Sequence, residues 1–127
     1  MTITPELQQN IFYTVYFTVV HNFSALVYFS GAIIFAGLSI VRPKRAFVLL
    51  LLGCIILLFG FEYQKHIEDS LRTQTLNSLI TIQEHNQVRR VVNATFVKLI
   101  PWGLPLAGWS LVGYGSYLLY TERKKTK

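Results

Sequence analysis

Charged residues are scarce in this chain of 127 residues, because Asp, Glu, Lys and Arg together make up only 14% of it. The hydrophobic residue types make up 52%, and the mean hydropathy is +0.41. A disordered chain combines low hydropathy with high charge, so this composition excludes one. About a quarter of an average soluble domain is charged, so the composition also disfavours a soluble domain.

Cysteine occurs once, as Cys54, which excludes an internal disulfide and any Cys-based zinc finger or ribbon. Catalytic signatures are missing as well. The chain contains no Gly-rich nucleotide loop, Walker sequence, His-Glu-x-x-His or Gly-x-Ser-x-Gly. The sequence therefore predicts a protein that is not an enzyme and that carries no cofactor.

Three stretches of the chain, 7–41, 46–61 and 99–121, contain no Asp, Glu, Lys or Arg. A helix that crosses a bilayer needs roughly 20 mostly apolar residues. The sequence predicts an all-α membrane protein with one membrane domain over 1–127. Its transmembrane helices are expected near 12–41, 46–65 and 99–120. The second span can extend to Lys65, because this side chain can place its ammonium group at the interface.

Basic residues are concentrated in two short segments that lie on the same side of a three-span chain. They are Arg42, Lys44 and Arg45 between the first two spans, and Arg123, Lys124 and Lys125 in the tail at 121–127. These segments carry the whole formal excess of +6. Lys and Arg in short loops are retained in the cytoplasm, so we expect a plasma or inner membrane protein with its N-terminus outside and its C-terminus cytoplasmic. This topology accounts for the basic pI without nucleic acid, which we do not expect as a partner.

The first charge-free stretch is longer than a bilayer core, so part of it must tilt or project. Counting back roughly 20 residues from Val41 places the outer boundary near His21 and Asn22. The portion from Ile11 to Val20 would then lie at or beyond the outer interface.

The connection at 64–98 contains neither Gly nor Pro, and its apolar residues fit helical stripes. We expect an extramembrane, hairpin-like pair of helical segments joined near 84–87, with 73–78 as the alternative turning point. The pair either stands as a continuation of the second and third spans or lies flat on the membrane. The upright arrangement is preferred, and it would pack against the projecting start of the first helix.

Small residues recur at helical spacing in all three predicted spans. The expected helix-packing residues are Ala32 and Ala36 in the first span, Gly53 and Gly60 in the second, and Gly103 and Ala107 in the third. Small residues let helix backbones approach closely in lipid. The pattern fits packing within one three-helix bundle, with a homo-oligomer contact as the alternative.

The third span opens with two prolines, Pro101 and Pro105, which indicate a helix start at the interface or, as the alternative, a gating hinge. Trp102 at this end is expected at the outer interface. Tyr114, Tyr117 and Tyr120 precede the basic tail and are expected at the inner one, because aromatic residues are enriched at both membrane surfaces.

Two histidines, His21 and His66, are expected at the same outer depth, because each lies about 20 residues from the inner end of its span. Imidazoles on neighbouring helices can hold a haem or a transition metal. The alternative is that both are ordinary interfacial polar residues.

The sequence thus predicts a non-enzymatic accessory, scaffold or assembly subunit. Its partners would be the lipid bilayer and either another membrane protein or a second copy. Two rivals stay open: a haem- or quinone-associated anchor subunit using His21 and His66, and a small oligomeric transporter or channel.

Overall fold

The computed structural model describes residues 5–79 and 86–126, and the elements within that part are helical. They are α1 (Pro5–His21), α2 (Phe23–Val41), α3 (Arg45–Glu62), the π-helical turn η1 (Tyr63–Ile67), α4 (Glu68–Leu79), α5 (Asn86–Asn93), the π-helical turn η2 (Ala94–Leu99) and α6 (Ile100–Lys125). The predicted all-helical class is confirmed for these residues.

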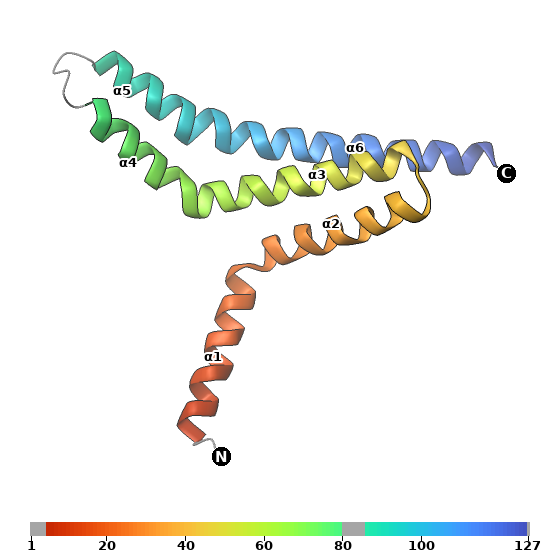
Figure 1. Cartoon of the computed structure of the whole chain (residues 1–127), viewed down its shortest axis with the longest axis horizontal. Helices are drawn as coiled ribbons and strands as arrows, with labels where there is room; N and C mark the ends of the chain where they lie inside the picture. Colours follow the sequence, from red (N-terminus) through yellow and green to blue (C-terminus); the bar gives the residue numbers. More distant parts are fainter. Residues whose placement is uncertain (1–4, 80–85, 127) are drawn as a thin grey trace.

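The first predicted helix is interrupted rather than continuous over 12–41. Asn22 leaves helical geometry with φ −108° and ψ 17°, while its side-chain Nδ2 donates to the Thr18 carbonyl at 2.8 Å. α1 therefore points away from α2 at a large angle (Figure 1). The break falls at the residues expected at the outer boundary.

α3 is the central helix of the bundle, because both α2 and α6 pack against it. Pro43 has no N–H to continue α2, and the short turn around it reverses the chain into α3. The hydrophobic residues buried in the described part of the chain all lie on α3 or just after it: Ala46, Leu50, Cys54, Leu57 and Tyr63. The core is thus a narrow seam along one helix.

Two long continuous helices run antiparallel for the rest of the chain (Figure 1). One extends from Arg45 to Ser78 and the other from Asn86 to Lys125. The helical pair α4 and α5 therefore continues the helices that precede and follow it, in the upright arrangement.

The long helix that contains the third predicted span begins at Asn86, as expected for an upright helical pair that continues this span. The prediction that this helix starts at the two prolines is wrong, because Pro101 and Pro105 fall inside a continuous helix. Residues 73–78, the alternative turning point, are helical within α4. Of the preferred turning point at 84–87, Asn86 and Gln87 belong to α5 and the other two residues lie outside the described part.

Within residues 5–79 and 86–126, three helices are long and apolar enough to cross a membrane. They are Phe23–Val41, Arg45–Ser78 and Asn86–Lys125, with mean hydropathies of 2.0, 2.4 and 1.2 over their most apolar windows. α2 contains no buried residue even though it is almost wholly apolar. Large apolar surfaces left open in this way mark a membrane or protein contact. The fold is thus that of a membrane protein.

Candidate functional site

α3 and α6 approach each other closely through glycines. A Cβ built at Gly108 would lie 2.6 Å from Leu57 Cγ, and one at Gly115 would lie 2.9 Å from Leu50 Cγ. On the opposite helix, a Cβ at Gly53 would lie 3.0 Å from the Gly108 carbonyl oxygen. No side chain fits at these positions without a shift, so the missing Cβ atoms set the distance between the helices.

The residues that make this contact differ in part from the expected ones. Gly53 and Gly60 face α6, whereas Gly103 and Ala107 are exposed, and a Cβ at Gly103 would meet nothing within 4 Å. α6 instead uses Gly108 and Gly115, which were not among the expected packing residues. Their seven-residue separation, which matches that of Gly53 and Gly60, is the signal that would have found them.

The contact between α2 and α3 is formed by other small residues. Ala32 and Ala36 are half-buried on α2. A Cβ at Gly31 would lie 3.0 Å from the Cys54 sulfur, so Cys54 fills the space above that glycine. Cys54 thus packs between two helices.

The π-helical turns η1 and η2 are joined by a hydrogen bond that compensates for a proline. The Ile100 N–H bonds back to the Thr95 carbonyl, five residues earlier. In this register the Phe96 carbonyl would accept from residue 101, but Pro101 has no N–H. The buried Tyr63 hydroxyl donates to the Phe96 carbonyl instead, at 3.2 Å.

A second bond at this level comes from Gln64, whose Nε2 donates to the Pro101 carbonyl at 3.0 Å. The outer part of α6 is therefore tied to η1 by side chains. π-helical turns occur frequently at functional sites, and here they mark the level at which the helical pair α4 and α5 departs from the bundle.

Lys65 connects this level to the break between α1 and α2. Its ammonium group donates to the His21 carbonyl at 3.2 Å and also to the Asn22 side-chain oxygen. The same ammonium lies 5.3 Å from the centre of the Phe61 ring, within cation–π range. The Lys65 ammonium thus binds both the His21 carbonyl and the Asn22 side chain at the point where the first helix bends.

The two histidines of the haem or metal hypothesis lie at a similar level, since Lys65 next to His66 contacts His21. Their rings face other groups. His21 stacks on Phe17 with 5.4 Å between ring centres, and His66 Nε2 lies 3.5 Å from a Glu62 carboxylate oxygen. Among the described residues, no cluster of three or more His, Cys, Asp or Glu side chains could hold a metal ion.

The side chains of α1 are uncovered. Its four large aromatic residues, Phe12, Tyr13, Tyr16 and Phe17, are between 61% and 68% exposed. Besides the Lys65 bond, the main contact of α1 with another helix is a small one with α2. The expectation that the helical pair α4 and α5 covers this segment is therefore wrong, because α1 bends away from it (Figure 1).

The helical pair carries a shallow basic cavity of about 450 Å³. Arg72, Arg90 and Lys98 supply its positive charge, and Asn93 links its walls by accepting a bond from Arg72 Nε at 2.9 Å. In the part of the chain that the structure describes, no acidic side chain lines the cavity. Such a surface is suited to an acidic group on a partner.

The basic residues at the other end of the bundle lie close together. Lys44 in the turn between α2 and α3 forms a 2.8 Å ion pair with Glu122 near the end of α6, so the turn and the tail share one end of the molecule. The predicted basic segments, with Arg42, Arg45, Arg123, Lys124 and Lys125, are thus brought to one end. Trp102, Tyr114, Tyr117 and Tyr120 are all exposed on α6.

Comparisons with protein-family models, with curated proteins and with solved structures found no match to this chain.

Proposed function

We propose that the chain is a non-enzymatic assembly or scaffold subunit in a cell membrane, which it crosses three times. In this proposal α1 and the helical pair α4 and α5 lie outside, and the basic end lies in the cytoplasm. The distribution of Lys and Arg supports this orientation. The protein would bind its partner chiefly through α1.

The observation that carries the proposal is the uncovered apolar surface of α1. At about 100° per residue, the apolar positions from Ile11 to Val20 occupy roughly two-thirds of the helix circumference. The remaining stripe is narrow and polar, with Asn10, Thr14, Thr18 and His21 at spacings of three and four. A helix that is apolar on most sides is normally buried.

A membrane surface would cover only part of α1. Helices that lie in the lipid interface have a strongly charged polar face rich in Lys and Arg. α1 has neither Lys nor Arg, and its Thr14 hydroxyl is already bonded to the Asn10 carbonyl at 2.7 Å. A protein surface can cover the remaining sides, and the basic cavity of Arg72, Arg90 and Lys98 offers a second, polar contact to the same partner.

Site-specific photocrosslinking in native membranes tests the proposal. A benzophenone amino acid placed at Phe12 or Tyr16 on the apolar side should give a protein adduct of one fixed mass. The matched control is the same probe at Thr14, on the polar stripe of the same helix, which should give at least several-fold less adduct. An adduct at twice the chain mass would identify a second copy as the partner.

Lipid adducts alone from Phe12 and Tyr16 would contradict the proposal. A protein adduct of equal yield from all three positions would contradict it as well, because contact would then not depend on the apolar side.

A further inference from the structure

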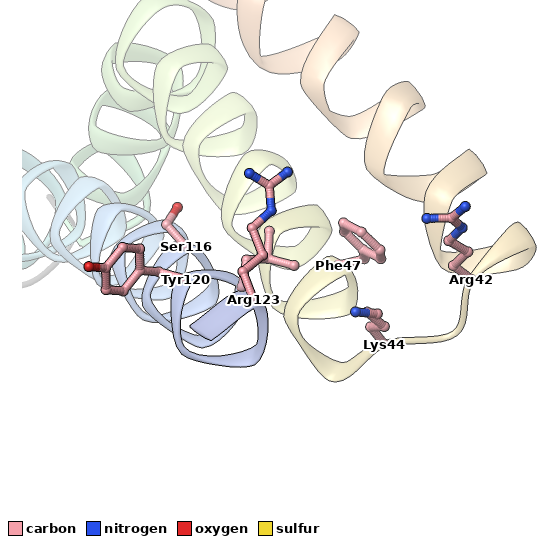
Figure 2. Close-up of a pocket in the computed structure, with 7 residues that line it drawn as sticks. Arg42, Lys44, Phe47, Ser116, Tyr120 and Arg123 are labelled. Atoms are coloured by element: carbon pink, nitrogen blue, oxygen red, sulfur yellow. The ribbon is translucent and has the colours of Figure 1, made fainter. Parts of the chain in front are cut away.

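The basic end of the bundle contains a cavity of about 440 Å³ between the turn that follows α2 and the last turns of α6 (Figure 2). Arg42 and Lys44 line it from the turn, and Arg123 lines it from α6. Three basic side chains from segments far apart in the sequence therefore line one cavity. The cavity lies at the opposite end of the bundle from α1 and from the helical pair α4 and α5.

Two of these three cations are free to bind a ligand. Lys44 is paired with Glu122 at 2.8 Å. Within 5–79 and 86–126, the Arg42 and Arg123 side chains form no hydrogen bond and no ion pair. Among the described residues, no acidic side chain lines the cavity. Guanidinium groups match the geometry of a phosphate and bind it through two parallel hydrogen bonds.

The remaining walls of the cavity combine apolar and hydroxyl groups. Phe47 from α3 and Leu119 from α6 are apolar, and the Phe47 ring lies between Arg42 and Arg123 in Figure 2. Ser116 and Tyr120 line the cavity one helical turn apart on α6. A ligand that fits has an anionic group for the guanidinium groups and an apolar part that contacts Phe47 and Leu119.

The apolar side of the cavity continues along α6 toward the middle of the bundle. Gly113 lies one turn before Ser116, on the same side of the helix, and a Cβ there would meet nothing within 4 Å. Further along this side, Trp109 contacts Tyr28 of α2 with 6.5 Å between ring centres. An extended hydrocarbon chain can therefore lie against α6 between the cavity and that aromatic pair.

We infer that this cavity is a binding site for one anionic phospholipid. The Arg42 and Arg123 guanidinium groups hold the phosphate of the headgroup, and an acyl chain passes Phe47 and Leu119 toward Gly113. Basic pockets between membrane helices are suited to such headgroups. The inference depends on the chain lying in a membrane, but it does not depend on the partner proposed for α1.

The test measures lipid retention by native mass spectrometry on the full chain purified in a mild detergent. Dioleoyl phosphatidylglycerol and dioleoyl phosphatidylcholine are compared, because their acyl chains are identical and only the first has a net negative headgroup. We expect one retained phosphatidylglycerol per chain and little retained phosphatidylcholine. Equal retention of the two lipids would overturn the site.

Variants separate a built site from a general attraction to positive charge. The R42Q/R123Q double variant should weaken phosphatidylglycerol binding by about tenfold or more. The control K124Q/K125Q removes the same charge from adjacent residues that do not line the cavity, and it should change binding less than about twofold. Equal losses in the two double variants would overturn the site in favour of diffuse electrostatics.

A third variant probes the acyl chain and keeps the test decisive if R42Q/R123Q fails to fold. Gly113→Leu leaves every charge in place, and its Cβ would meet nothing within 4 Å, but its side chain would occupy the path of the acyl chain. We expect it to lower phosphatidylglycerol retention. Unchanged retention would exclude the proposed path.

Free anions distinguish a lipid site from a phosphate site. Inorganic phosphate and glycerol 3-phosphate, in large excess, should not displace the bound phosphatidylglycerol, because neither supplies the apolar contact. Complete displacement by either would show that the cavity binds a soluble phosphate and would overturn the lipid assignment.

Discussion

Single glycines determine how closely the two longest helices pack. Gly108 lies beneath Leu57, and Gly115 lies beneath Leu50, so each leucine occupies the place of a missing Cβ. In lipid, where burial of apolar surface gives no net drive, such close contacts are a main source of helix association. The stability of the bundle therefore depends on residues that have no side chain.

Gly108→Ala should destabilise the bundle by about 1–3 kcal/mol, the usual range for overpacking. The added Cβ would lie 2.6 Å from Leu57 Cγ and 3.3 Å from the Gly53 carbonyl oxygen, so the helices would have to separate. Thermal unfolding in detergent, followed by circular dichroism, measures the effect.

Gly113→Ala is the matched control on the same helix, because a Cβ there would meet nothing within 4 Å. Its stability should stay unchanged or rise slightly, since alanine favours a helix over glycine. Equal losses of stability in Gly108→Ala and Gly113→Ala would show that the close contact at Gly108 does not determine the packing.

The sequence predicted these residues only in part. Gly53 and Gly60 were assigned to the packing side of their helix, and they face α6. In the third span, Gly103 and Ala107 form one possible stripe and Gly108 and Gly115 form another. Spacing within one helix cannot select between stripes, because the choice depends on the position of the facing helix.

At the scale of elements, the bend between α1 and α2 was not predictable from local sequence. No Gly or Pro lies near Asn22, and the surrounding run contains no Asp, Glu, Lys or Arg. The bend is held by a distant residue, since Lys65 bonds the His21 carbonyl and the Asn22 side chain. The Tyr63 bond to the Phe96 carbonyl is likewise a contact between segments far apart in the sequence.

Lys65→Met should loosen the angle between α1 and the rest of the molecule. Hydrogen bonds from charged groups contribute about 1.5–3 kcal/mol to stability. Because Lys65 is partly exposed, we expect its bonds to stabilise the bend by about 1 kcal/mol. Distances between spin labels at Tyr13 and Asp69, measured in a Cys54→Ala background, should spread over a wider range.

Lys98→Met serves as the control, because it removes an ammonium group from η2 without touching the bend. If the spin-label distances in Lys65→Met are spread as narrowly as in the unchanged chain, then other contacts hold α1.

At the scale of the whole molecule, the three long apolar helices were predictable because hydropathy and charge act on entire segments. α2 ends at Val41 and α3 begins at Arg45, within a residue of the predicted positions. The continuation into the helical pair was harder to predict, because polar helices can either stand or lie flat.

The proposed orientation predicts a cytoplasmic C-terminus. Green fluorescent protein fused after Lys127 should fluoresce, and alkaline phosphatase fused there should be inactive. A cysteine placed at Asn77 in a Cys54→Ala background should react with an impermeant maleimide added outside intact cells. Active alkaline phosphatase at Lys127 would reverse the orientation and place the basic end outside.

The paired π-helical turns constrain how the chain can change in length. A π-helical turn holds one residue more than an α-helical turn, so each of η1 and η2 rotates the helix after it by about 100°. The Tyr63 bond to Phe96 links these two offsets. Deleting one residue from either turn would rotate the outer part of that helix by about 100° and separate Arg72 Nε from the Asn93 side-chain oxygen.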